Sequence, residues 1–224
     1  MIGMLKAIQD RHSVRRYLDT PITGDVKKQL SDIIAASNEQ SGLSIQLITD
    51  EPKAFGSIVA TYGLLKNVRN YIAIVGPDSP SLNEMAGYYG EQIVLHAQML
   101  GLNTCWVAGT YKKSAVICDL KPGERLVCVI AIGYGVTHGK PHRSKSEKCL
   151  FRSYTEFVPE WFKNGLHAAM LAPTAVNQQR FLLTLQDNNC VNARATGGFY
   201  SDIDLGIVKL HFEIGAGVEN FHWI

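Results

Sequence analysis

The segment Arg11–Arg15, with the sequence Arg-His-Ser-Val-Arg, places two guanidinium groups, an imidazole and a hydroxyl within five residues. Guanidinium groups bind phosphate oxygens in a bidentate manner, and a serine hydroxyl or a backbone amide can add a further hydrogen bond. The segment therefore suits the phosphate of a bound cofactor. The alternative is an exposed basic helix end, and the five residues taken alone favour that alternative.

A second polar segment, Pro173–Gln179, lies far downstream and has the sequence Pro-Thr-Ala-Val-Asn-Gln-Gln. Its leading proline predicts a turn, and its hydroxyl and amide groups can hydrogen-bond the edge of a polar heterocycle. Together with Arg11–Arg15 it suggests a cofactor that carries both a phosphate and a ring, held between two parts of the chain. For this segment the alternative is an ordinary surface loop.

Composition and charge limit the class of protein. The chain has 224 residues, of which 46% are hydrophobic and 19% are charged. These values are typical of a globular protein that buries a substantial core, as one large domain or as two small interlocked ones. The net charge of +2 gives no reason to expect nucleic-acid binding. The basic stretch 138–148 is too short and too poor in aromatic residues for a nucleic-acid platform and is typical of a solvated loop.

The cysteines and the apolar runs indicate where the protein resides. The five cysteines form no Cys-x-x-Cys pair and no cluster with histidine, so we expect no zinc site. Their odd number favours reduced thiols in an intracellular protein. The longest apolar runs are short, as in 127–132, and lie far below a membrane span of roughly 20 residues. Met1–Gln9 lacks the apolar core of a signal peptide, so we expect a cytoplasmic protein without membrane segments.

Apolar periodicity predicts the helices and strands that must position the two polar segments. The clearest element is a helix over 83–100, where apolar and small side chains recur at helical spacing and Gly101 is placed to end the helix. Further helices are predicted over 4–10, 24–37, 52–66, 157–171 and 203–216. Strands are predicted over 44–49, 71–75, 104–107, 126–132 and 180–186.

The chain also contains a faint internal repeat, in which a helix–turn–strand order and a Gly…Gly…Trp run recur. The aligned stretches are 33–37 with 169–173, 45–47 with 181–183, and Gly90…Gly101…Trp106 with Gly206…Gly217…Trp223. The repeat predicts two related halves, 1–145 and 146–224, of which the second is shortened.

Four segments resemble motifs of the FMN-dependent nitroreductase family. Arg11–Arg15 is similar to the Arg-x-Ser-x-Arg/Lys motif that opens that family's sequences, and Pro173–Gln179 is similar to its Pro-Ser-x-x-Asn-x-Gln turn. Gly101–Gly109 resembles its Gly-Leu-x-x-Cys-Trp segment, which runs under the flavin ring. Ala131–Gly135 resembles its last core strand.

The resemblance implies an α+β fold of the nitroreductase type, with a central, mainly antiparallel sheet flanked by helices and with two intertwined related halves.

One departure from the family is informative. In the family the Pro-Ser-x-x-Asn turn follows the first motif closely and serves the flavin of the partner subunit. Here the corresponding stretch, 37–41, has lost the pattern, and the intact turn lies in the second half. The chain thus resembles a fused, internally duplicated branch, a pseudo-dimer in one polypeptide that binds one FMN between its halves. Whether this unit pairs again stays open.

The residues that the resemblance assigns to FMN fall into two groups. Those expected to hold the phosphate, the ribityl chain and the ring are Arg11, His12, Ser13, Arg15, Lys66, Val107, Ala108 and Gly109. Those expected to close on the phosphate and on the flavin edge are Arg143, Lys145, Pro173, Thr174 and Asn177. Gln179 would support the turn. For Lys66 an exposed helix lysine is the alternative, and Cys105 is interpreted as core packing rather than as a catalytic thiol.

The resemblance implies an oxidoreductase that takes hydride from NADH or NADPH in a ping-pong cycle and reduces a nitroaromatic, a quinone or a similar small acceptor. No catalytic side chain and no metal are expected, because the cofactor carries the chemistry. The alternatives are a flavin-binding sensor without turnover, or a flavin reductase, dehalogenase or oxidase on the same fold. The sequence leaves the acceptor and the choice between NADH and NADPH open.

Overall fold

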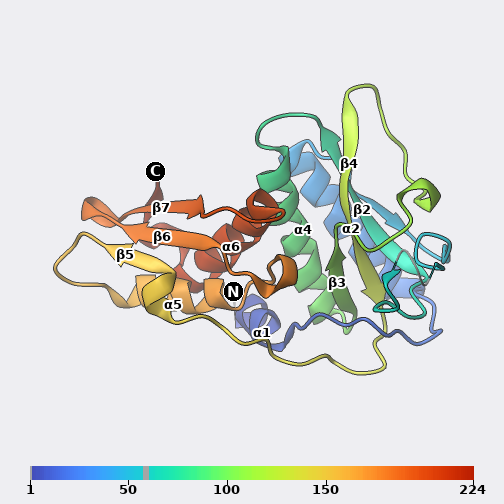
Figure 1. The fold of residues 1–224 in the computed structure, drawn as a ribbon, viewed down its shortest axis with the longest axis horizontal. Helices are drawn as coiled ribbons and strands as arrows, with labels where there is room; N and C mark the ends of the chain where they lie inside the picture. Colours follow the sequence, from blue (N-terminus) through green and yellow to red (C-terminus); the bar gives the residue numbers. More distant parts are fainter. Residues whose placement is uncertain (1, 58–60) are drawn as a thin grey trace. The chain divides into compact units, whose positions relative to one another are not determined.

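The computed structural model describes residues 2–57 and 61–224 (Figure 1). Its α-helices are α1 (Ile2–Asp10), α2 (Gly24–Ser41), α4 (Leu82–Met99), α5 (Glu160–Met170) and α6 (Ser201–Ala216). Its strands are β1 (Gln46–Ile48), β2 (Asn70–Pro77), β3 (Asn103–Val107), β4 (Glu124–Gly133), β5 (Phe151–Ser153), β6 (Phe181–Leu185), β7 (Cys190–Ala195) and β8 (His222–Trp223). The protein is of the mixed α+β class, which confirms the fold class expected from the sequence.

The chain forms two compact units. Unit 1 consists of Met1–Asp10, Asn83–Gln92 and His142–Ile224, and unit 2 consists of Arg11–Leu82 and Ile93–Pro141. The units differ in extent from the sequence halves 1–145 and 146–224, because α1 and the first part of α4 belong to the unit that holds most of the second half. Duplication of the two halves stays a prediction.

Unit 2 contains an antiparallel sheet with the strand order β1-β2-β4-β3. Every residue of β2 from Asn70 to Gly76 is buried. This explains the unbroken apolar run of the strand, since a strand covered on both faces has no reason to alternate. In the register of the sheet, Tyr71 of β2 and Cys105 of β3 both lie opposite Ala131 of β4. The strand that precedes the predicted ring-lining residues is therefore anchored in the core of unit 2.

Unit 1 contains a mixed sheet with the strand order β5-β6-β7-β8. Strands β6 and β7 form an antiparallel pair, whereas β5 pairs with β6 and β8 pairs with β7 in parallel. The described residues thus hold two four-stranded sheets where one central sheet was expected, because the short strands β5 and β8 complete a separate sheet around the β6–β7 pair.

Aromatic packing fixes helix α6 within unit 1. The ring of Phe212 on α6 lies 5.3 Å from that of Phe162 on α5 and 5.1 Å from that of Phe221. Phe162 and Phe212 are fully buried, and burial of one such side chain contributes roughly 1.5–3 kcal/mol. Helix α6 therefore offers a firm support for the polar segments next to it.

Two glycines allow α4 and α6 to come into backbone contact in unit 1. A Cβ atom added at Gly87 would lie 2.0 Å from the carbonyl oxygen of Ile203, and one added at Gly206 would lie 1.9 Å from that of Glu84. Only glycine fits at these two positions. The sequence analysis pointed to small residues on this helix but did not single out Gly87.

Most predicted elements are confirmed within a few residues. The helix expected over 83–100 is α4, and Gly101 follows it with a positive φ of 78°. The sequence analysis did not predict β5, β7 or β8. The helix expected over 52–66 includes residues 58–60, which lie outside the described residues. Its described flanks, 52–57 and 61–66, consist mainly of turns and extended residues.

Candidate functional site

In unit 2 the structure gathers residues that the sequence analysis assigned to the cofactor. We call Arg11, His12, Ser13, Arg15, Lys66, Val107, Ala108 and Gly109 the first contact set. Its N-terminal part, 11–18, is an extended segment held by the backbone of other elements. Val14 N–H donates to the Thr104 carbonyl of β3 at 2.9 Å. Leu18 N–H donates to the Tyr134 carbonyl, just beyond β4, at 2.8 Å.

Lys66 lies beside this segment. Its backbone N–H donates to the Arg15 carbonyl at 2.8 Å, and its carbonyl accepts from Tyr17 N–H at 3.2 Å. The side chains of Lys66 and Arg15 are both exposed. The structure therefore joins the backbones of two cationic residues that are far apart in the sequence, and both residues are exposed.

Cys105 of β3 connects the Gly101–Gly109 segment with the Arg11–Arg15 segment. Burial raises the pKa of its thiol, whereas the positive charges of Arg15 and Arg11 and a hydrogen bond with Ser13 favour the thiolate. Arg11 is itself only 4% exposed. The thiol lies in the apolar core cluster of unit 2, which agrees with its interpretation as a packing residue.

The residues expected to line the flavin ring lie at the end of β3 and directly after it. Val107 is the last residue of the strand, lies opposite Val129 and is buried. Ala108 is half-buried and Gly109 is exposed, so the chain emerges from the core within two residues.

Gly139, at the start of the basic loop, lies close to His12 of the first contact set. A Cβ atom added at this glycine would be 2.7 Å from the Cβ of that histidine. The start of the basic loop thus packs against the first motif.

Unit 1 holds the second contact set, which consists of Arg143, Lys145, Pro173, Thr174 and Asn177. The side-chain amide of Asn177 donates to the Arg143 carbonyl at 2.9 Å. Lys145 donates to Gln179 twice, from its backbone N–H to Oε1 at 2.6 Å and from Nζ to the carbonyl at 3.1 Å. The basic loop and the 173–179 turn therefore form one hydrogen-bonded structure.

Gln179 supports the turn from the inside. It is 1% exposed, its N–H donates to Thr174 Oγ1 at 3.0 Å, and its side-chain amide donates to the Met170 carbonyl at 3.1 Å. The sequence analysis expected this supporting role, and the hydrogen bonds confirm it. They also engage Thr174 Oγ1 as an acceptor, so this hydroxyl can still donate to a ligand.

The turn has a strained backbone. Val176, Asn177 and Gln179 have φ values of 47°, 54° and 43°, and the left-handed region is unfavourable for residues with a Cβ, most of all for a β-branched one. Val176 is also 89% exposed, so burial offers little compensation. Each such residue costs on the order of 1–3 kcal/mol and is retained where the surroundings or a function require it.

Gln178 and Asp204 fasten the turn to α6, and neither was predicted to have a role in the site. Both oxygens of Asp204 accept from Ala175 N–H, at 2.9 and 3.1 Å, and its Oδ2 accepts from the Gln178 amide at 2.8 Å. Burial raises the pKa of Asp204 to about 6, while the contacts with Gln178 and Ala175 act to lower it. An acidic residue in the first turn of a helix is common, and only the unusual burial of Asp204 distinguishes it.

Comparison with known proteins decides the family. The family described as "Putative TM nitroreductase" matches residues 3–216. The chain belongs to this nitroreductase family. None of the curated proteins compared with it matches its sequence.

Solved structures share the nitroreductase fold with this chain. A "putative nitroreductase" from Thermotoga maritima has a TM-score of 0.66 and 20% identity, over 95% of this chain and 82% of its own. A "nitroreductase-like protein" from Streptococcus mutans has a TM-score of 0.55 and 12% identity, over 71% and 100%. A "putative NADH dehydrogenase/NAD(P)H nitroreductase" from Bacteroides thetaiotaomicron has a TM-score of 0.51 and 24% identity, over 66% and 95%.

As a member of the nitroreductase family, the chain is an oxidoreductase. Members of this family generally use a flavin. Taken by itself, the first contact set contains guanidinium and hydroxyl groups of the kind that bind a phosphate. The second contact set, also taken by itself, contains a hydroxyl and an amide of the kind that hydrogen-bond the edge of a heterocycle.

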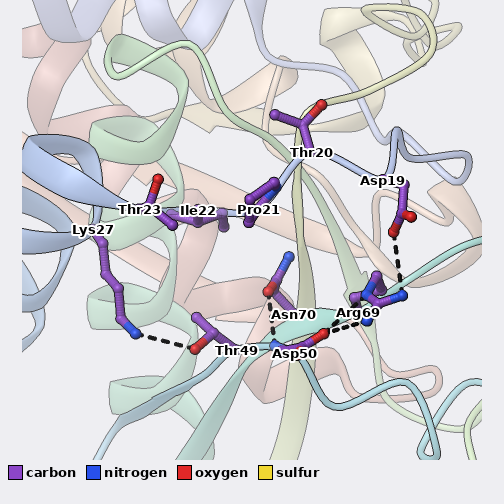
Figure 2. A pocket seen from close by; sticks show the side chains of 10 residues that line it. All are labelled: Asp19, Thr20, Pro21, Ile22, Thr23, Lys27, Thr49, Asp50, Arg69 and Asn70. Atoms are coloured by element: carbon purple, nitrogen blue, oxygen red, sulfur yellow. Dashed lines mark hydrogen bonds and ion pairs between the residues drawn. The ribbon is translucent and has the colours of Figure 1, made fainter.

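A pocket of about 420 Å³ lies elsewhere in unit 2 and is lined by no residue of the first contact set (Figure 2). Arg69 is paired there with Asp19 at 3.2 Å and with Asp50 through Nε at 3.0 Å. Lys27 Nζ donates to the Thr49 hydroxyl at 3.2 Å. Because Arg69 already pairs with both acidic residues of the pocket and Lys27 binds the Thr49 hydroxyl, we assign no cofactor to this pocket.

Two further observations concern the described residues only. Across 2–57 and 61–224, the structure contains no group of three or more His, Cys, Asp or Glu side chains that could hold a metal ion. Within the same ranges, no helix has both the length and the apolar character that a membrane crossing requires.

Proposed function

We propose that this nitroreductase-family chain is an FMN-dependent oxidoreductase that uses NADH or NADPH. The observation that supports the proposal is that, in unit 2, the Arg11–Arg15 segment is hydrogen-bonded through its backbone to Lys66 and to β3, the strand that leads to Val107, Ala108 and Gly109. Bound FMN would supply hydride chemistry in a ping-pong cycle, from the nicotinamide to a nitroaromatic, a quinone or a similar small acceptor.

The residues of the chain would bind and orient the cofactor. Arg15 presents an exposed cation for the phosphate and would bind it and the ribityl chain together with Arg11 and Ser13, whereas the exposed Lys66 would reach the pyrimidine end of the ring. Val107, Ala108 and Gly109 would line the ring with backbone and small side chains, which leave room for a substrate. Arg143, Lys145, Thr174 and Asn177 are proposed as further FMN contacts, on the basis of the family resemblance.

We also propose that the chain is a fused pseudo-dimer with one FMN per polypeptide. The order of elements supports this proposal. The chain runs helix, strand, strand, helix, strand twice. The first series is α2, β1, β2, α4 and β3, and the second series, in unit 1, is α5, β6, β7, α6 and β8. The glycines that follow α4 and α6, Gly101 and Gly217, have the same φ of 78°.

The test is the visible spectrum of the purified protein, followed by heat release and quantification of the chromophore. We expect about one equivalent of FMN per chain and anaerobic bleaching by NADH or NADPH. Bound flavin that neither nucleotide reduces would instead indicate a sensor without turnover. Two equivalents per chain would contradict the pseudo-dimer. A colourless protein that does not bind added FMN would contradict the proposed function.

A further inference from the structure

The 173–179 turn of unit 1 depends on one buried carboxylate. We propose that Asp204 is the positioning residue of this turn and that FMN binding weakens when Asp204 is protonated. The inference rests on the proposed function, because it concerns the turn that carries Thr174 and Asn177 of the second contact set. It adds a residue that acts on the cofactor site without belonging to either contact set.

The hydrogen bonds of Asp204 suit a positioning role. Its carboxylate accepts from a backbone donor, Ala175 N–H, and from a side-chain donor, the amide of Gln178, at distances between 2.8 and 3.1 Å. The side chain is 4% exposed, so water cannot readily replace either donor. One carboxylate therefore fixes the turn on both sides of Val176 and Asn177, two of its positive-φ residues.

The support behind Asp204 is rigid. Its backbone N–H donates to the Tyr200 carbonyl at 3.0 Å in the first turn of α6. Two residues further along α6, Gly206 lies against the backbone of Glu84, where an added Cβ would be 1.9 Å from the carbonyl oxygen. Because α6 cannot shift at this contact, the position of the carboxylate is fixed and the turn must conform to it.

Gln178 is enclosed as well. Its side-chain amide donates to the Phe199 carbonyl at 2.7 Å in addition to Asp204. A Cβ added at Gly198, which has a φ of 108°, would lie 2.3 Å from Gln178 Oε1. The amide therefore has little freedom to find another acceptor when Asp204 changes its protonation state.

Protonation would weaken this arrangement because it removes the negative charge that strengthens both hydrogen bonds. Hydrogen bonds to an ionised carboxylate are roughly twice as strong as those to a neutral group, and both Ala175 N–H and the Gln178 amide donate to Asp204. Burial raises the pKa of Asp204 to about 6, so this carboxylate takes up its proton at a higher pH than an ordinary aspartate. A backbone with three positive φ angles is expected to relax once these contacts weaken.

Other groups near the turn also titrate or carry charge, and the test must separate them. On the elements around the turn they are His142, Arg143, Lys145, Arg180, Tyr200, Asp202 and the Glu84–Lys209 pair. His142 is the most relevant, since its Nε2 lies 3.0 Å from the Met170 carbonyl and 3.3 Å from the Gln179 amide. The FMN phosphate adds a second ionisation with a pKa of about 6.

Three proteins separate these contributions: the wild type, Asp204→Asn and Asp202→Asn. Asparagine at 204 keeps the shape of the protonated acid but cannot titrate. Asp202 is exposed on the same helical turn, so its replacement changes the charge equally without touching the 173–179 turn. The dissociation constant of FMN is measured by fluorescence titration between pH 5 and pH 7.5.

At pH 7.5 we expect Asp204→Asn to bind FMN about ten-fold more weakly than the wild type, as for a lost hydrogen bond to a charged group. The ratio of the two constants should approach 1 at pH 5, where the wild type is itself protonated. His142 and the FMN phosphate are present in both measurements, so any effect of their ionisation on the dissociation constant cancels in this ratio. Asp202→Asn should match the wild type at every pH.

A ratio near 1 throughout, with tight binding by the wild type, would overturn the inference and leave the proposed function intact. A ten-fold ratio that does not change with pH would also overturn it. A wild type that does not bind FMN would overturn both. If Asp204→Asn does not fold, Gln178→Ala replaces it. That variant removes one donor, should weaken binding at pH 7.5, and contradicts the inference if it binds like the wild type.

Discussion

Arg15 is the exposed arginine of the first contact set, and its carbonyl is hydrogen-bonded to Lys66 N–H. Replacing Arg15 by alanine should weaken FMN binding by about 1.5–3 kcal/mol, since a charged contact to a phosphate would be lost. Arg16→Ala is the matched control, because Arg16 is also exposed but lies outside the set. Equilibrium titration of FMN fluorescence measures both. Unchanged affinity in both Arg15→Ala and Arg11→Ala would remove the phosphate assignment.

Asn177 tests the second contact set. Asn177→Ala removes the hydrogen bond to the Arg143 carbonyl together with the proposed flavin contact, so we expect a higher dissociation constant for FMN in the same titration. Alanine also tolerates the positive φ of this position less well than asparagine. Asn189→Ala controls for that strain, since Asn189 is exposed and has a φ of 57°. Equal effects of the two variants would contradict a role of Asn177 in cofactor binding.

Asp204 also predicts how stability changes with pH. Its pKa is about 6 in the folded protein and 3.8 for the ordinary group, so protonation favours the folded state. The contribution of this residue to stability is therefore largest below about pH 4 and is lost as the pH rises through 6. Between these two pH limits, the contribution of Asp204 to the free energy of unfolding changes by at most about 3 kcal/mol.

Urea unfolding of the wild type and of Asp204→Asn at pH 7 and pH 4.5 measures this contribution. The wild type should gain stability relative to the variant at the lower pH. FMN binding is expected to move in the opposite direction, which separates the loss of cofactor from unfolding. A constant difference between the two proteins would show that Asp204 has the same pKa in the folded and unfolded states.

At the level of single residues, the sequence predicted which side chains would gather but not what holds them in place. Arg11, Ser13 and Arg15 were grouped by their spacing, and the structure places them around Cys105. Gln178 and Asp204 went unnoticed because their contact joins a turn to a helix that periodicity describes only by its apolar face. A tertiary hydrogen bond of this kind leaves no local pattern.

Helices α4 and α6 meet through glycine, and this contact yields a prediction about stability. Alanine normally stabilises a helix interior relative to glycine, by about 1 kcal/mol. At Gly87 the added methyl group would meet the Ile203 carbonyl at 2.0 Å. We therefore expect Gly87→Ala to lower the free energy of unfolding by about 1–3 kcal/mol, as overpacked sites do.

Chemical denaturation of Gly87→Ala measures the effect. Met99→Ala at an exposed position of the same helix serves as the control and should change stability by less than about 0.5 kcal/mol. A stabilised Gly87→Ala would show that the two helices can separate without loss.

Among the elements, periodicity located the helices better than the strands. Helix α4 and strand β2 have long, consistent apolar patterns, and both were predicted within a few residues. Strands β5 and β8 span three and two residues, too few for a pattern to appear. Strand β7, Cys-Val-Asn-Ala-Arg-Ala, has only one fully buried side chain, that of Val191, so its pairing with β6 rather than its own composition defines it.

At the scale of the whole molecule, the repeated order of elements supports a chain built from two related halves, whereas the compact units are not those halves. The sequence could suggest the repeat but could not reveal that Asn83–Gln92 belongs to unit 1. The close glycine contact of α4 with α6 gives a physical reason for that assignment, since it ties the first part of α4 to the C-terminal elements.

This arrangement affects the order in which a growing polypeptide can fold. Unit 2 is complete in sequence once residue 141 has been synthesised, so its sheet can form while the ribosome is still translating. Unit 1 cannot form at that stage, because α1 and the first part of α4 are synthesised well before their partner α6. Contacts between such distant segments form slowly, and the apolar faces of α1 and α4 remain uncovered until α6 has been synthesised. During this interval we expect the nascent chain to be prone to aggregation.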